Sequence, residues 1–180
     1  MFSMCNTCIV ILHSYKARKG NTLDVLPELY AYITRNEVTE PQYLCGFKVQ
    51  PREFTNLVEW LASQTGQCHG KVIFHIVLAF DPIKDADKTP EQVYDVGRKV
   101  GYELGQFCEL RFIGVMDLHL DTTPAHIHYL FSNIDYKTGR RFSPNKRDLA
   151  DIKKYVNYVL IENGFSPIKL FESHHRELWE

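Results

Sequence analysis

At 180 residues, of which 44% are hydrophobic and 13% aromatic, the chain is long enough for one domain with a substantial core. The formal net charge of −1 excludes a protein that is basic all over its surface, and no apolar stretch reaches the length of a membrane span. The N-terminal segment carries its positive charges after a short apolar run, which is the reverse of a secretory signal. We therefore expect one cytoplasmic domain over residues 1–180, with no membrane partner.

The cysteines do not have the pattern of a disulfide framework, because their number is odd and their spacing is scattered. They are Cys5, Cys8, Cys45, Cys68 and Cys108. The first two form a single Cys-x-x-Cys pair without a second pair. Buried thiols are therefore a better interpretation than a zinc or redox site.

Strands and helices alternate along the first half of the chain. Residues 9–12 are predicted to form a strand, 26–33 a short helix, and 44–49 a second strand. A helix is predicted over residues 51–65, with apolar side chains on one face, followed by a strongly apolar strand over 71–80. Two polar residues share one face of that strand: His75, which is expected either to line a site or to be a core histidine, and Asp81, which is expected at a solvated strand end.

The second half continues the alternation. Thr89 to Gln92 have the form of a capping box, and the apolar spacing after them predicts a helix to about Leu104. A β-hairpin is predicted from residues 111–121 and 125–134, then a tight turn at 137–139 that leads into a short strand. A last helix is expected over residues 146–163, with Gly164 as its stop. The predicted fold class is α+β, with a central antiparallel β-sheet and flanking helices.

The predicted hairpin concentrates imidazole groups. His126 and His128 are two residues apart, so on a strand both rings leave from one face while the residues between and after them face the core. The hairpin would bring His119 across from this pair, and Asp121 is placed to accept a hydrogen bond from a ligating ring. A lone histidine in a strand is more often a satisfied polar residue than a ligand. Three that converge predict a metal site.

A site with three protein ligands leaves coordination positions open, which is typical of catalysis. Imidazole suits Mn²⁺ or Zn²⁺, whereas Mg²⁺ prefers oxygen ligands and is the less natural occupant. We expect a divalent metal cofactor, with Mn²⁺ as the functional ion and Mg²⁺ or Zn²⁺ as alternatives.

Basic residues cluster in two parts of the chain. The segment from residue 135 to 154 holds seven basic residues against three acidic ones. Candidates for contact with phosphates are Lys137, Arg140, Arg141, Lys146 and Arg147, together with Lys16, Arg18 and Lys19 near the N-terminus. Solvated loops often have this composition, but basic clusters that flank a metal site would form a phosphate-binding surface.

The order of several motifs resembles the relaxase domain of plasmid and integrative-element mobilisation proteins, the MobP-type branch of the HUH endonucleases. The family's Y-I-T-x-x-E-x-T is matched by residues 32–39, its Y-H-x-x-x-S-F strand by 74–80, and its T-P-E-Q motif by 89–97. Its H-x-D-x-x-H-x-H-x-H metal motif is matched at His119, Asp121, His126 and His128, and its G-x-S-x-I by 164–168. The spacing before His126 is longer than in the family, and Asn36 and Val38 replace the proline and lysine of its N-P-E-K-T.

This resemblance implies metal-dependent nicking of one DNA strand at a transfer origin through a 5′-phosphotyrosine. Tyr32 matches the nucleophile, with Tyr30, Tyr15 and Tyr43 as rivals. The implied partners are single-stranded DNA of the transfer origin and accessory relaxosome proteins. Two other functions stay open: a degenerate relaxase that binds DNA without cutting it, and a metal-dependent phosphodiesterase that uses activated water and no tyrosine.

Overall fold

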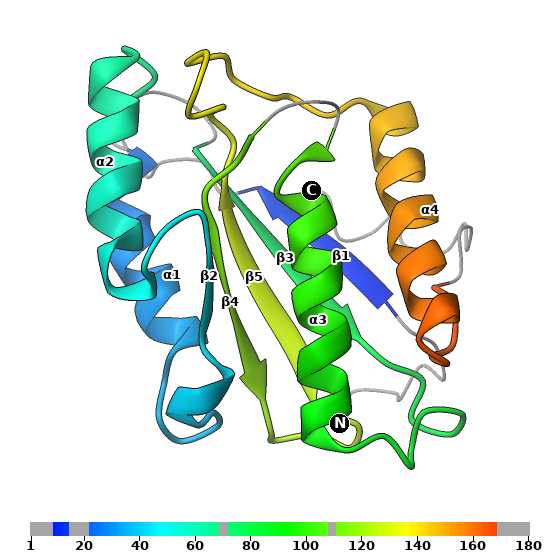
Figure 1. The fold of residues 1–180 in the computed structure, drawn as a ribbon. Coiled ribbons are helices and arrows are strands. Elements are labelled where there is room, and N and C mark those ends of the chain that lie inside the picture. Colours follow the sequence, from blue (N-terminus) through cyan, green and yellow to red (C-terminus); the bar gives the residue numbers. More distant parts are fainter. Residues whose placement is uncertain (1–8, 15–21, 69–71, 108–110, 169–180) are drawn as a thin grey trace, which may run out of the picture.

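The computed structural model describes residues 9–14, 22–68, 72–107 and 111–168. Five strands form one antiparallel sheet in the order β1-β3-β5-β4-β2 (Figure 1). Their bounds are β1 Ile9–Ser14, β2 Cys45–Phe47, β3 Ile73–Ala79, β4 Gly114–His119 and β5 His126–Ser132. The expected hairpin therefore forms, and its two strands lie near the centre of the sheet.

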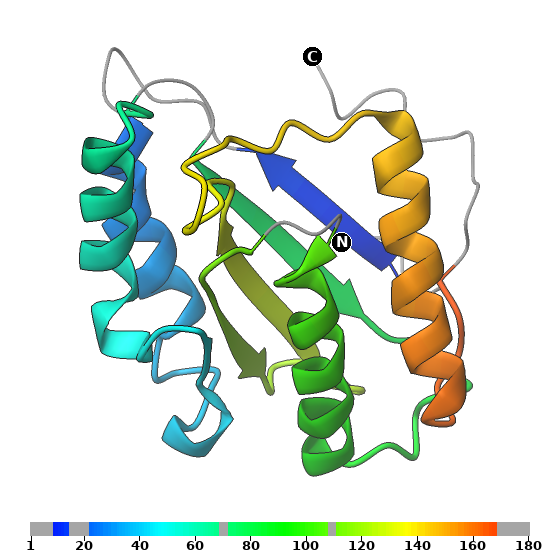
Figure 2. The ribbon, with the colours of Figure 1, turned by 45° about the horizontal axis from the view of Figure 1, so that its top comes forward.

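Helices cover both faces of the sheet (Figures 1 and 2). One face packs against α3 and α4, and the other against α1 and α2. The helices are α1 Leu26–Ile33, α2 Phe54–Gln64, α3 Pro90–Leu104 and α4 Lys146–Glu162, with short 3-10 helices at Thr22–Val25, Pro41–Tyr43 and Pro51–Glu53. Strand alternation thus gives each central strand two buried faces, of which only one carries the histidines.

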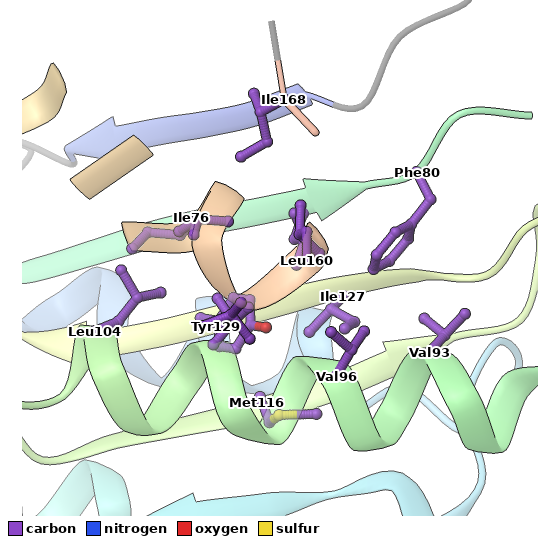
Figure 3. Packing of buried hydrophobic residues seen from close by; sticks show 14 of the residues in the cluster. Ile76, Phe80, Val93, Val96, Leu104, Met116, Ile127, Tyr129, Leu160 and Ile168 are labelled. Carbon is purple, nitrogen blue, oxygen red and sulfur yellow. The ribbon is translucent and has the colours of Figure 1, made fainter. Parts of the chain in front are cut away.

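Close packing of α3 on the sheet depends on a small residue. The helix begins with the predicted capping box, in which Thr89 accepts from the Gln92 backbone and Gln92 bonds back. At Gly97 a Cβ atom would lie 2.2 Å from the side chain of Ile127, and the Gly97 carbonyl accepts a hydrogen bond from Tyr129 at 2.9 Å. Figure 3 shows Ile127 and Tyr129 directed from β5 into the core between the sheet and the helices.

The predicted α+β class with a central antiparallel sheet is confirmed, and the helices lie within a few residues of their expected bounds. The strand expected after the 137–139 turn is wrong, because only an isolated bridge between Ile134 and Arg141 forms there. Asp81 is not at a solvated strand end. It is buried, with its carboxylate accepting hydrogen bonds from the backbone of Ile83 and Lys84.

Some expectations fall on parts that the structure does not describe. Cys5, Cys8 and Cys108 lie outside the described residues, so the interpretation of the cysteines stays a prediction, as does the single-domain organisation. Among the helices within the described ranges, none is both long and apolar enough to cross a membrane.

Candidate metal centre and active site

The three predicted histidines converge on the face of the sheet that is covered by α1 and α2. In the β4–β5 pairing His119 lies opposite His126, and His128 is two residues further along β5. One possible ligand atom from each ring lies within 4.8 Å of the others. The ring centroids of His119 and His128 are 4.2 Å apart, and those of His126 and His128 are 5.0 Å apart. A single cation could therefore reach all three.

Each ring has one nitrogen engaged by the protein. His119 Nε2 lies 2.8 Å from the Ile33 carbonyl, to which it donates as the N–H tautomer. Nδ1 of His126 lies 2.9 Å from the Thr122 hydroxyl, and Nδ1 of His128 lies 2.7 Å from Nε2 of His75.

The second nitrogen of each ring is available as a ligand for a metal. Nδ1 of His119 is buried and has no hydrogen-bond partner, and the Nε2 atoms of His126 and His128 lie 3.1 Å apart. A buried ring nitrogen without a partner is costly, and a metal ion would satisfy it. The donor set therefore fits a divalent cation that accepts imidazole ligands.

Burial keeps the three rings neutral, which is the form that binds a metal. It lowers the pKa of His119, and it lowers the pKa of His126 with a further contribution from His119. The pKa of His128 is lowered to about 2, chiefly by burial and then by the neighbouring histidines. Protons would therefore not compete for the ligand atoms near neutral pH.

Tyr32 is the tyrosine that faces the three histidines. It lies in the last turn of α1, and its ring centroid is 5.5 Å from that of His128 and 6.0 Å from that of His119. Its side chain is 42% exposed, so a substrate could approach it from solvent. The other two described candidates are engaged elsewhere. Tyr30 stacks on Phe54 in the α1–α2 core, and Tyr43 is buried with its hydroxyl donating to Glu91. Tyr15 lies outside the described residues.

Asp121 follows β4 and lies next to His126. Its carboxylate is 3.6 Å from His126 Nδ1 and 3.7 Å from the Arg35 guanidinium, so both contacts are longer than hydrogen bonds. The hydroxyl of Thr122 is the closer partner of His126. Asp121 therefore sits at the site as expected, but it is not the group that fixes the ring of His126 in this structure.

The basic candidates do not flank the histidines. Residues 137–141 follow the far end of β5, and α4 begins beyond them, so both lie at the end of the sheet opposite to the β4–β5 turn (Figure 1). Seven residues of β5 span roughly 20 Å at about 3.3 Å per residue. Arg141 also donates to the Gln67 carbonyl, which is a structural role. The expectation that this cluster adjoins the metal site is wrong, because the strand separates them.

The other predicted basic cluster lies outside the described residues. It comprises Lys16, Arg18 and Lys19. Whether either cluster contacts DNA stays a prediction.

Two residues at the site, Asp117 and Arg35, were not expected from the sequence. Asp117 faces the same side as His128, is only 1% exposed, and accepts a hydrogen bond from Thr39 at 2.5 Å. Burial raises its pKa to about 6, against the opposing hydrogen bonds of Thr39 and the Leu118 backbone. Period-two alternation back from His119 could have found Asp117. Arg35, whose guanidinium lies over the Tyr32 ring, had no comparable signal.

Comparison with known proteins decides the family. The model for MobA/VirD2-like relaxases, nuclease domain, matches residues 32–165, a range that includes Tyr32 and the whole histidine cluster. The chain belongs to this family. The expected resemblance to the mobilisation relaxases is thereby confirmed at the level of the family.

Two relatives agree with this assignment. The chain is 28% identical over 92 residues to the protein rlx of Staphylococcus aureus, a match that covers 51% of this chain and 26% of rlx. It is 27% identical over 94 residues to the group II intron-interrupted relaxase LtrB of Lactococcus lactis subsp. cremoris, which covers 52% of this chain and 16% of LtrB. The matched region is thus 26% of the length of rlx and 16% of the length of LtrB, so this chain corresponds to only part of these relatives.

The fold is also found in a solved relaxase domain. The MobM relaxase domain, described as Mn-bound and in complex with plasmid pMV158 oriT DNA, superposes with a TM-score of 0.58 at 12% identity, covering 89% of each chain. At this identity the likeness concerns the fold alone. It confirms the expected relaxase-like architecture.

Proposed function

We propose that this domain nicks one DNA strand at a transfer origin by a metal-dependent transesterification in which Tyr32 is the nucleophile. The observation that carries the proposal is the position of Tyr32, whose ring centroid lies 5.5 Å from that of His128 and which is 42% exposed to solvent. In the proposed reaction the phenol oxygen bonds to phosphorus and the bond from phosphorus to the 3′ oxygen breaks. The phenol loses one proton and the 3′ hydroxyl gains one, so no further reactant is needed.

His119, His126 and His128 would hold the metal. The fit rests on the unpartnered Nδ1 of His119 and on the two Nε2 atoms of the other rings, which lie 3.1 Å apart. Once bound, a divalent cation would polarise the phosphoryl group and offset the negative charge that develops on it. Mn²⁺ is our first choice for the functional ion, with Zn²⁺ and Mg²⁺ as alternatives.

The residues around the triad would keep its geometry. His75 would orient His128 through Nδ1, and the Ile33 carbonyl would orient His119. The carboxylate of Asp121 lies beside His126, where its negative charge would offset part of the charge of a bound cation. Because Ile33 directly follows Tyr32, the hydrogen bond to His119 also ties the nucleophile to the metal strand.

The proposed substrate is single-stranded DNA of a transfer origin. The complex of MobM with oriT DNA supports a DNA partner for this fold. The described basic residues Lys137, Arg140, Lys146 and Arg147 would then contact a stretch of strand away from the cut, and accessory relaxosome proteins are further expected partners.

The test is a denaturing gel of the purified protein with labelled single-stranded oligonucleotides that tile the transfer origin, with and without Mn²⁺. We expect a metal-dependent product that carries covalently attached protein, and its loss in Tyr32→Phe and in His126→Ala. Tyr30→Phe is the matched control, because its ring packs on Phe54 away from the triad.

Two results would replace the proposal. Cleavage that survives Tyr32→Phe without a covalent adduct would favour a phosphodiesterase that uses activated water. Sequence-specific binding without cleavage, unchanged by metal, would favour a degenerate DNA-binding relaxase.

A further inference from the structure

Arg35 lies two residues after the end of α1, in a segment that is fixed to the metal strand. The Ile33 carbonyl bonds to His119, the Val38 carbonyl accepts from the Leu120 backbone at 2.6 Å, and Thr39 bonds to Asp117. These contacts hold the segment at both ends against β4. The side chain of Arg35 is therefore placed at the histidine cluster by the fold.

The guanidinium of Arg35 has N–H donors that are not fully engaged by the protein. Its central carbon lies 4.6 Å from the Tyr32 ring centroid, and its contact with Asp121 is 3.7 Å long. Its Nε atom is buried and has no hydrogen-bond partner. An arginine presents five N–H donors in a planar fork that matches phosphate oxygens. The arrangement thus leaves a desolvated donor beside the proposed nucleophile.

The charge of Arg35 reaches the whole cluster. Burial is the main cause that lowers the pKa of His119, His126 and His128, and the neighbouring histidines add to it for His126 and His128. The positive charge of Arg35 is a smaller cause that lowers the pKa of all three. Three neutral imidazoles would leave the charge of a bound divalent cation undiminished. The carboxylates of Asp121 and Asp117 would offset at most two of the three positive charges contributed by the cation and Arg35. The surplus at this place is positive, which suits a phosphodiester.

We propose that Arg35 is a phosphate-binding residue, whose guanidinium exchanges its loose contact with Asp121 for a non-bridging oxygen of the phosphate that Tyr32 attacks. The inference rests on the proposed function and deepens it. The sequence resemblance does not supply the role, since Arg35 stands where the N-P-E-K-T pattern of the family has asparagine. Contact with Tyr32 on one side and with the phosphate on the other would hold the two reacting groups together.

The first measurement is the affinity for a thymidine dinucleotide, which carries a single phosphodiester. It is obtained by ³¹P NMR titration in the presence of Zn²⁺. Loss of a charge-assisted hydrogen bond should weaken binding about tenfold or more in Arg35→Gln, with Arg35→Lys in between. Arg98→Gln is the matched control. It also removes a guanidinium that lies over a tyrosine ring, 5.9 Å from the Tyr94 centroid, but on α3 and on the other face of the sheet.

Zn²⁺ affinity, measured by calorimetry on the same variants, should not fall in Arg35→Gln, because removal of a nearby positive charge does not disfavour a bound cation. A loss of Zn²⁺ affinity in Arg35→Gln would assign the residue to the structure of the triad and overturn the proposal. Equal dinucleotide affinity in wild type and Arg35→Gln, or no binding by wild type, would overturn it too.

The second measurement is the rate of covalent product formation on an oligonucleotide that wild type cuts. We expect a decrease of about 100-fold in Arg35→Gln. In Arg35→Ala, which leaves room for the missing group, we expect partial rescue by added ethylguanidinium. If wild type cuts no oligonucleotide but its affinity for the dinucleotide still depends on Arg35, the proposed nicking function is wrong and the phosphate site is supported. If Arg35→Gln cuts DNA at the wild-type rate, the proposed role of Arg35 is overturned and the nicking function is not affected.

Discussion

Nε2 of His75 lies 2.7 Å from Nδ1 of His128, with both side chains buried. The two rings come from neighbouring strands and stack with their centroids 5.0 Å apart. This hydrogen bond decides which nitrogen of His128 faces the cluster, because an imidazole that is held at Nδ1 offers Nε2 to a metal.

We expect His75→Phe to lower the affinity for Mn²⁺ or Zn²⁺ by about 10- to 100-fold, since loss of an outer partner of a metal ligand typically has an effect of this size. Isothermal titration calorimetry would measure it, with far-UV circular dichroism to check the fold. His75→Gln keeps a hydrogen-bonding group and should lose less. Wild-type affinity in His75→Phe would show that the hydrogen bond has no part in metal binding.

Thr39 and Asp117 join the segment after α1 to β4. Thr39→Val would leave a buried carboxylate without its hydroxyl partner, and we expect a loss of about 1–3 kcal/mol in the free energy of unfolding, measured by urea denaturation. Thr39→Ser keeps the hydroxyl and should stay near wild type. The effects of Thr39→Val and Asp117→Asn should not add in a double-mutant cycle, because the two side chains share one interaction. Additive effects would contradict the coupling.

The basic residues beyond β5 should affect DNA binding only for long substrates. Charge removal at Lys137, Arg140 and Lys146 should reduce the slope of log K against log salt by about 0.7 for each lost phosphate contact with a single strand. Fluorescence anisotropy between low and moderate salt would measure this with oligonucleotides of increasing length. A short oligonucleotide that covers only the cut site should bind the variant as it binds wild type. An equal loss for short and long strands would place the cluster in contact with the cut site after all.

Asp135 should make the stability of the domain depend on acidic pH. Burial alone would raise its pKa, but hydrogen bonds from the backbone of Thr138, Lys137 and Arg111 outweigh burial, and the net pKa is lowered. A carboxylate with a depressed folded pKa stabilises the fold at pH values above its ordinary value of 3.8, and this contribution is lost as the pH falls through the lower, folded value.

Thermal unfolding of Asp135→Asn and wild type between about pH 7 and pH 3 would test this. We expect Asp135→Asn to be less stable near neutrality, by about 1–3 kcal/mol, and the difference to shrink as the pH falls below 4. A constant difference over this range would contradict a role for the charged form.

Spacing along the chain was sufficient to predict the helices, most of the strands and part of the candidate site. Local signals were enough for the capping box of α3 and for the alternation in β5, where Ile127 and Tyr129 pack in the core and His126 and His128 face the other way. These features follow from spacing along one strand or helix, and hydrophobic burial enforces that spacing wherever the sheet is placed.

Contacts between residues that are distant in sequence depend on how the strands pair and the helices pack. His75 and His128 are far apart in sequence and contact each other because β3 pairs with β5, and Arg35 reaches Tyr32 and Asp121 because α1 ends against β4. The extended course of β5 puts the histidines and the basic turn at opposite ends of one strand, although both lie in the short stretch of sequence from His126 to Arg141. A strand carries the chain about 3.3 Å per residue in one direction, so closeness in sequence does not give closeness in space, and only strand order and helix packing determine it.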